Sequence, residues 1–279
     1  MTVAASSPTL YYHVGMGKVA STYLREAFFP LLRGAYFIPR SKKYQTLSIM
    51  AAGGYDKYIL CRALDANMED GIKDIAAAYP GTHPIIVFRR PDSWIASQYR
   101  RFVKNGFPGT LREFVDIHGN EGFLDHNEML FMQKIRLLER YFTARPLAMF
   151  IEEMKTDPRS FFDAIAAYVG CDYDFEAVRL APIHTSHNPK GLRFRRQVRR
   201  RFAKSMPRYT RIPVLHWLQR RALMVWAYLL IAIGNRLPES WLDDEPLIDE
   251  AYLDEIRQFT ATDWADLQSY AAETRRQLA

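Results

Sequence analysis

Short apolar runs alternate with amphipathic stretches along most of this chain. Four runs have the length and composition of buried strands: Leu10–Val14, Lys57–Cys61, His83–Phe88 and Leu147–Ile151. Stretches with helical spacing lie between or after them, at about Ser21–Leu32, Met68–Tyr79, Arg90–Lys104, Asn127–Phe142 and Pro158–Val169. Strands that alternate with helices predict an α/β fold, with a parallel sheet as the middle of three layers and helices on both of its faces.

Roughly the last ninety residues contain helical patterns and no strand-like run. A chain of 279 residues is long for one domain and short for two. We therefore expect an α/β domain over residues 1–205 and an all-helical extension over residues 206–279, packed on it as one continuous globular unit.

The cysteines and the N-terminal residues bear on the compartment. The chain has two cysteines, Cys61 and Cys171, which lie far apart in apolar surroundings and indicate reduced thiols rather than a disulfide framework. The opening residues, MTVAASSPTL, lack the basic and apolar segments of a secretory signal. We expect a cytoplasmic protein, with peripheral contact to the inner membrane face left open.

The net charge of +7 is concentrated in one part of the chain. Twelve Lys or Arg and no Asp or Glu occur from Lys190 to Arg221, whereas eleven acids and three bases occur from Glu239 to the end. Such a basic block fits an anionic partner, which can be a nucleic acid, a phosphorylated ligand or a membrane surface. The alternative is that the basic helix and the acidic tail face each other or face water.

The first predicted strand ends in a loop that contains glycines and a lysine, in the stretch HVGMGKVASTYL. A strand, a tight loop and a helix N-terminus direct backbone N–H groups toward one point, which is the geometry of a phosphate site. Gly15 and Gly17 allow close backbone approach, and Lys18 brings a mobile charge. Ser21 and Thr22 can donate hydroxyls at the start of the helix.

The spacing departs from the nucleoside-triphosphatase signature. That signature requires Ser or Thr directly after the lysine, to place a hydroxyl on magnesium. Val19 stands at that position. A P-loop kinase or another magnesium-dependent nucleotide enzyme is therefore an alternative interpretation and not the first one.

The loop resembles the 5′-phosphosulfate loop of sulfotransferases that use 3′-phosphoadenosine 5′-phosphosulfate (PAPS), a family with a P-loop-like α/β fold. In that family a lysine is followed by a small residue, two hydroxyl residues, an aromatic residue and a leucine. The resemblance implies contacts to the donor from Gly17, Lys18, Val19, Ala20, Ser21, Thr22 and Tyr23.

A second stretch, VFRRPDSWIASQY, also follows a predicted strand and opens a helix. It resembles the 3′-phosphate site of the same family, where an Arg at a strand end is followed eight residues later by a Ser. Arg89 and Ser97 match these positions, and a planar guanidinium suits a phosphate. Arg90 stands where the family usually has Asn, and Asp92 comes one position early.

Two later stretches are also similar to the family. Leu147–Gly170 resembles its strand, acidic pair, Asp-Pro and helix. His184–Gln197 occupies the place of its late cofactor loop, with Lys190 and Gly191 as the implied contacts to the donor, although Pro189 stands where the family usually has Arg. The resemblance covers about residues 10–200.

The resemblance implies sulfuryl transfer from PAPS to a hydroxyl or amine of a glycan, a lipid or a small metabolite, with adenosine 3′,5′-bisphosphate (PAP) as product and no metal. Lys18 would stabilise the leaving phosphate. Relatives carry a His or Glu at the end of the second strand as general base, but the place near Ala63 has neither. Asp65 is the nearest carboxylate there, and His126 is the second candidate.

An apolar run, Ala222–Gly234, indicates what this part of the chain can pack against. It has thirteen uncharged residues, fewer than the roughly twenty that a membrane span needs. It predicts either a buried helix or a helix that lies in a membrane interface beside the basic block.

Two alternatives involve no catalysis. One is a membrane-surface protein. The other is a nucleic-acid binding protein, because Phe194, Phe202 and Tyr209 are interleaved with arginines. A nucleic-acid partner is disfavoured, because it leaves both predicted phosphate loops unexplained. The sequence is also compatible with a homo-oligomer.

Overall fold

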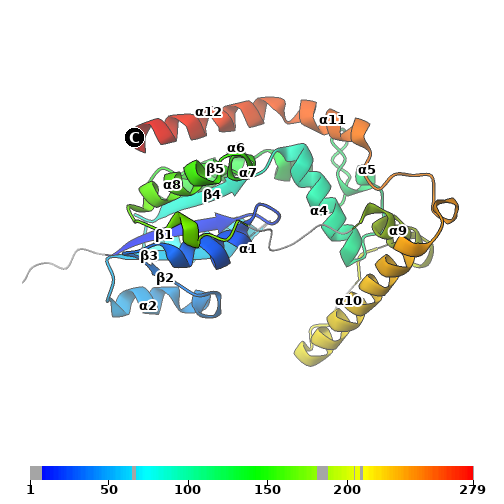
Figure 1. The fold of residues 1–279 in the computed structure, drawn as a ribbon, viewed down its shortest axis with the longest axis horizontal. Helices are drawn as coiled ribbons and strands as arrows, with labels where there is room; N and C mark the ends of the chain where they lie inside the picture. The colour runs from blue at the N-terminus through cyan, green and yellow to red at the C-terminus, as the bar shows by residue number, and fades with distance from the viewer. Residues whose placement is uncertain (1–7, 65–66, 181–187, 204, 208–209, 279) are drawn as a thin grey trace, which may run out of the picture. The chain divides into compact units, whose positions relative to one another are not determined.

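The computed structural model describes residues 8–64, 67–180, 188–203, 205–207 and 210–278. Its contacts group them into two compact units, whose helices and strands Figure 1 labels. The first unit holds the described residues within 1–90, 130–183 and 260–279, and the second holds those within 91–129 and 184–259. Helices on both sides of residue 205 thus group together, while the C-terminal helix groups with the sheet.

A five-stranded parallel sheet forms the centre of the first unit, in the order β2-β3-β1-β4-β5. The strands are β1 (Thr9–Gly15), β2 (Tyr36–Phe37), β3 (Lys57–Ala63), β4 (His83–Phe88) and β5 (Leu147–Phe150). β1 pairs on both sides, so that His13 lies opposite Cys61 in β3 and opposite Ile85 in β4. β1, β3, β4 and β5 are mostly buried, as their apolar composition predicts.

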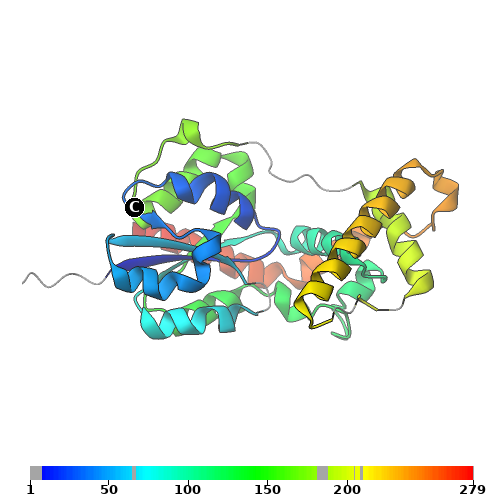
Figure 2. The same cartoon turned by 90° about the horizontal axis from the view of Figure 1, so that it is seen from below.

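Alternate side chains of β1 point to two helical layers, because successive residues of a strand face opposite sides of the sheet. The Tyr12 hydroxyl donates to the carbonyl of Gly71 at 3.1 Å on one side, whereas the His13 ring lies 5.4 Å from the Phe29 ring on the other. The Tyr12 side is covered by α3 (Met68–Ala78) and α6 (Met132–Tyr141). The His13 side is covered by α1 (Ser21–Tyr23), η1 (Leu24–Phe28), η2 (Phe29–Leu31) and α8 (Pro158–Val169) (Figure 2).

Five more elements belong to the described part of the first unit. Four of them are η3 (Arg40–Gln45), α2 (Thr46–Ala52), α7 (Ile151–Thr156) and the C-terminal helix α12 (Ala261–Leu278). The fifth is a 3-10 turn, η6 (Phe175–Ala177). The carboxylate of Asp263 in α12 accepts the backbone N–H groups of Phe131 at 2.6 Å and Met132 at 3.2 Å. These bonds satisfy donors at the start of α6 and join the C-terminal helix to the sheet unit.

The α/β fold class is confirmed, and most predicted elements lie within a few residues of the observed ones. β4 and α8 coincide with their predicted ranges. The helix predicted over Ser21–Leu32 consists of three short segments, of which the middle one is a π-helix. The helix predicted from about Asn127 begins at Met132, because a 3-10 turn, η5 (His126–Met129), precedes it. The two-residue β2 and the six-residue α7 were not predicted.

The second unit is built from helices. They are α4 (Pro91–Asn105), α5 (Leu111–Phe114), η5, α9 (Pro189–Phe202), α10 (Pro213–Arg236), η7 (Glu239–Trp241) and α11 (Glu250–Phe259). α9 and α10 approach closely at two glycines. A Cβ on Gly191 would lie 2.5 Å from the Ile231 carbonyl oxygen, and one on Gly234 would lie 2.5 Å from the Phe194 Cβ. Glycine is needed at both positions because no side chain fits there.

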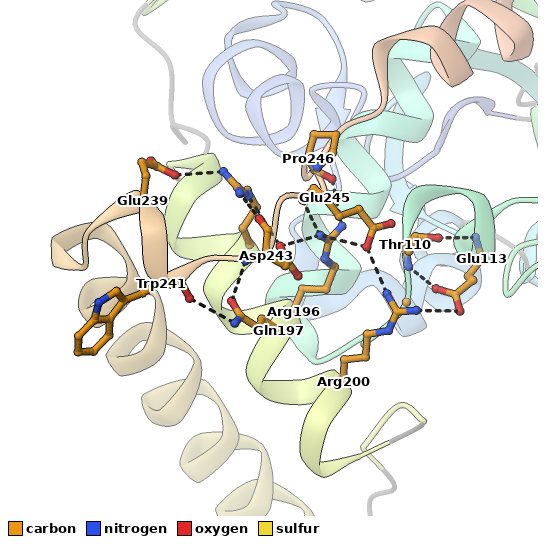
Figure 3. Close-up of polar contacts among 12 residues, drawn as sticks. Thr110, Glu113, Arg196, Gln197, Arg200, Glu239, Trp241, Asp243, Glu245 and Pro246 are labelled. Carbon is orange, nitrogen blue, oxygen red and sulfur yellow. Dashed lines mark hydrogen bonds and ion pairs between the residues drawn. The ribbon is translucent and has the colours of Figure 1, made fainter.

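The basic helix α9 faces the acidic segment that follows α10, as Figure 3 shows. Arg196 is fully buried, and its guanidinium donates to the carbonyls of Glu245 at 2.8 Å and Pro246 at 3.1 Å and to the Asp243 carboxylate at 3.4 Å. Arg200, one turn later, pairs with the Glu245 carboxylate at 3.2 Å, and half of its side chain is exposed. The interpretation in which basic helix and acidic tail face each other is thus confirmed for these residues.

We expect Arg196→Met to lower the free energy of unfolding by about 2–4 kcal/mol, because it removes the buried guanidinium and the hydrogen bonds that it donates to two carbonyls and a carboxylate. The matched control, Arg200→Met, removes a half-exposed ion pair on the same helix and should cost less than about 1 kcal/mol. Urea unfolding followed by circular dichroism measures both variants. If both variants lose the same free energy of unfolding, the buried Arg196 guanidinium stabilises the second unit no more than an exposed ion pair does.

Candidate functional site

The loops after β1 and β4 leave the same edge of the sheet, because all five strands are parallel. The pairing of His13 with Ile85 fixes the register, so Lys18 and Arg89 follow the ends of neighbouring strands. The strand order reverses at this place, since β2 and β3 lie on one side of β1 while β4 and β5 lie on the other. Ligands of open parallel sheets bind at the carboxyl ends of the strands where the order reverses.

The loop after β1 has a strained backbone. Lys18 has a φ of 70° and Ala20 has a φ of 62°, whereas Val19 between them keeps the ordinary negative sign. The left-handed region costs a residue with a Cβ about 1–2 kcal/mol. Alternating handedness turns successive N–H groups toward one side and forms an anion-binding concavity. Strain concentrated in one short loop is typical of a functional site.

Ser21 stabilises this loop through a buried hydrogen bond. Its hydroxyl is buried and donates to the Met16 carbonyl at 3.0 Å. A Cβ on Gly15 would lie 2.6 Å from the same hydroxyl oxygen, so the close approach requires glycine. Ser21 and Thr22 were the two predicted hydroxyl donors to a ligand. The Ser21 hydroxyl donates within the loop, whereas Thr22 is half-buried.

The other predicted contacts of the loop differ in exposure. Lys18 is exposed, Gly17 and Ala20 are half-buried, and Val19 is fully buried. The Val19 side chain therefore belongs to the core, and its backbone is the part that can contact a ligand.

Tyr23 anchors the start of the helix that follows the loop. Its side chain is buried, its ring stacks on Phe162 at 6.2 Å, and its hydroxyl donates to the Arg179 carbonyl at 2.5 Å. The sequence predicted Tyr23 as a ligand contact, but the structure places its side chain in the packing between this helix and α8.

The residues predicted for the 3′-phosphate lie in both units. Arg89 is half-buried at the end of β4 in the first unit, and Ser97 is half-buried in α4 in the second. Lys190 and Gly191 lie in the first turn of α9 and not in a loop. The Lys190 ammonium is 3.6 Å from the Glu239 carboxylate, while Gly191 is buried against α10, where it has a packing role.

A polar cavity of about 470 Å³ opens at the end of β3 in the first unit. The backbone N–H of Leu64 on its wall donates to the Gly15 carbonyl at 2.9 Å, so the cavity adjoins the loop after β1. The exposed Tyr44 ring lies 4.7 Å from the Lys43 ammonium and 5.6 Å from the Arg62 guanidinium. The carboxylate residues of the lining are Asp70 and Asp74.

The predicted general bases lie in different parts of the chain. Asp65 falls outside the described residues. His126 belongs to the second unit, where its ring lies 5.3 Å from the Phe259 ring and its Nδ1 is buried without a hydrogen-bond partner among the described residues. The sequence reasoning missed Asp70 and Asp74, whose spacing of four on one predicted helix places them on the same face.

A buried histidine and cysteine lie beneath the strained loop. The Nδ1 of His13 is 3.1 Å from the Sγ of Cys61, and this thiol lies 3.9 Å from the Ser21 carbonyl. Burial, and then the positive charge of Arg25, lower the pKa of His13 to about 3. Burial raises the pKa of Cys61 to about 12, against the smaller opposite effect of Arg25. Both groups are therefore neutral at physiological pH and support the loop as packing partners.

No family model matches the sequence, and no curated protein matches it. Among solved structures, the chain is similar to a sulfotransferase from Alicyclobacillus acidocaldarius, with 12% identity, a TM-score of 0.47 and coverage of 85% of this chain and 99% of that one. It is also similar to mouse sulfotransferase SULT7A1 in complex with PAP, with 17% identity, a TM-score of 0.40 and coverage of 62% of each chain. At these values neither likeness bears on function, which has to be inferred from the loops of this chain.

The buried His13 predicts a specific pH dependence of stability. Its folded pKa of about 3 lies below the ordinary 6.5, so the unfolded chain binds a proton that the folded chain does not, and stability falls as the pH drops below 6.5. Between about pH 7 and pH 5 this group should contribute a loss of about 2 kcal/mol. Urea unfolding at both pH values measures this. Between pH 7 and pH 5, His13→Asn should lose about 2 kcal/mol less free energy of unfolding than the unmodified protein does. If both proteins lose the same amount, His13 titrates normally in the folded state.

Proposed function

We propose that this protein is a PAPS-dependent sulfotransferase, which transfers a sulfuryl group to a hydroxyl or amine. The observation that carries the proposal is the pairing of two anion-binding elements at one sheet edge. The strained loop with Lys18 and the strand end with Arg89 follow the neighbouring strands β1 and β4, where the strand order reverses. PAPS carries phosphate groups at both ends of one nucleoside, so two such elements suit it.

The loop after β1 would hold the 5′-phosphosulfate end of the donor. Backbone N–H groups of residues 18–22 and the exposed Lys18 ammonium supply fixed and mobile positive charge there. In the transfer, the sulfur–oxygen bond to the 5′-phosphate breaks while a bond from sulfur to the acceptor oxygen or nitrogen forms, and the acceptor proton passes to a base. Lys18 would neutralise the charge that grows on the departing phosphate.

The strand end with Arg89 would hold the 3′-phosphate, through the planar fork of its guanidinium. Ser97 remains the predicted second contact. The buried Val19 side chain supports this donor over a magnesium–nucleotide complex, because no hydroxyl follows Lys18 at the position that a metal-binding loop uses.

The cavity at the end of β3 is the proposed acceptor site. It adjoins the loop after β1, as donor and acceptor must be neighbours for an in-line transfer. Its lining combines an exposed aromatic ring at Tyr44 with carboxylates at Asp70 and Asp74, which suit an acceptor rich in hydroxyl groups. Asp65 and His126 remain the predicted general bases, and the two lining carboxylates join them as candidates.

The 3′-phosphate assignment predicts nucleotide selectivity. Titration calorimetry should show that PAP binds at least about tenfold more tightly than adenosine 5′-monophosphate or ADP, which lack the 3′-phosphate. Arg89→Ala should remove most of that difference by weakening PAP binding alone. The matched control, Arg90→Ala, changes the adjacent exposed arginine and should preserve it. Equal binding of PAP and adenosine 5′-monophosphate by the unmodified protein would refute the proposed 3′-phosphate site.

The role of Lys18 predicts a loss of turnover that exceeds the loss of binding. With donor labelled in its sulfuryl group and a cell extract split into lipid and aqueous fractions, the unmodified protein should label one fraction. Lys18→Ala should lower the rate of labelling by about 100- to 1000-fold, because the leaving phosphate loses its counter-charge, while PAP affinity falls much less.

The control for this experiment is Lys155→Ala, which removes an exposed lysine from α7 and should keep the full rate. A normal rate in Lys18→Ala would remove Lys18 from the mechanism. The fraction that gains label also shows whether the acceptor is a lipid or a water-soluble compound.

A further inference from the structure

The helix α10 in the second unit exposes large apolar side chains around most of its circumference. Only Ala227, Ile231 and Gly234 are buried among its residues. Ten of its large apolar side chains are exposed, led by Val214 at 70% exposure and Val225 at 67%. The others include Trp217, Leu218, Trp226, Tyr228 and Leu229.

This exposure is unusual for a soluble helix. A helix with apolar residues all round is normally buried, and a contiguous exposed apolar patch marks an interaction site. The buried residues of α10 lie on the stripe that packs on α9, where Gly191 and Gly234 bring the two helices together. The opposite side, which carries Val225 and Leu229, is largely exposed among the described residues, and Trp217 lies on its flank.

The charges around this face select the partner. No Asp or Glu occurs from residue 177 to residue 238. Many cations of α9 already pair within the unit, as Arg193 does with Glu239 at 3.2 Å. By contrast, Arg220 and Arg221 on α10 and Arg211 just before it are exposed and have no carboxylate partner among the described residues. The face is thus apolar, rich in tryptophan and edged by unneutralised arginines.

We propose that the exposed face of α10 binds an anionic membrane surface, with the helix lying in the plane of the interface. Apolar side chains would enter the acyl boundary, while arginines contact phosphate headgroups and tryptophans occupy the headgroup level. None of the helices in the described part of the chain is long and apolar enough to cross a bilayer. The inference is independent of the proposed chemistry, since it concerns the second unit alone.

A second copy of the chain is the competing occupant. In a two-fold symmetric dimer the same surface meets itself, so each α10 would face a surface that carries arginines and no acid to neutralise them. An anionic lipid surface removes this repulsion and covers the same apolar area. The charge pattern therefore favours the membrane.

Flotation of the full-length protein with vesicles tests the proposal. We expect binding to vesicles of phosphatidylcholine with phosphatidylglycerol, a blue shift of tryptophan emission, and much weaker binding to phosphatidylcholine alone. The variant Val225→Asp with Leu229→Asp places two charges on the exposed face and should lower the bound fraction at least about tenfold. Both side chains are largely exposed, at 67% and 47%, so the fold should persist, and circular dichroism checks this.

The matched control, Gln258→Glu with Gln268→Glu, adds the same two negative charges at exposed positions of α11 and α12. It should leave binding nearly unchanged, because the apolar face stays intact. Equal loss in both variants would show that net charge alone drives binding and would overturn the assignment of the face. Failure to bind vesicles, together with a dimer that Val225→Asp with Leu229→Asp dissociates, would assign the face to self-association instead.

Discussion

The pairing of β1 with a parallel neighbour on each side is the constraint on which the first unit depends. It brings Lys57–Ala63 and His83–Phe88, which lie far apart in the sequence, to the two sides of one strand. Because the pairing is parallel, the loops after all three strands leave the same edge. The strained loop with Lys18, the strand end with Arg89 and the polar cavity at the end of β3 are all consequences of this arrangement.

A different interaction organises the second unit. The fully buried guanidinium of Arg196 gathers two backbone carbonyls and a carboxylate from the segment after α10. Burial of a charge is costly unless several partners surround it, so the acidic segment is held against α9. This pairing uses a large part of the basic block within the protein. The apolar, arginine-edged surface of α10 has no such acidic counterpart among the described residues, which is why we propose it as the surface for an outside partner.

The loop after β1 shows how local strain and core packing share one segment. Lys18 and Ala20 adopt left-handed backbone conformations, while Val19 and Tyr23 place their side chains in the core and Ser21 bonds to the loop backbone. The buried residues fix the loop so that its unfavourable conformation persists. Side chains that a motif suggests as ligand contacts therefore serve the scaffold in part, and the backbone N–H groups are the contacts that a ligand would meet.

Some features follow from the sequence because they depend on near neighbours in the chain. The apolar run at His83–Phe88 became the expected strand, and the helical spacing over Pro158–Val169 became the expected helix. The loop of glycines and Lys18 follows its strand as predicted. The π-helical turn, the packing role of Gly191 and the cavity lined by Asp70 and Asp74 were not predictable in this way. Local patterns determine which segments are strands and helices, whereas contacts between distant segments decide which side chains are buried and which polar groups meet, because that choice depends on which surfaces pack together.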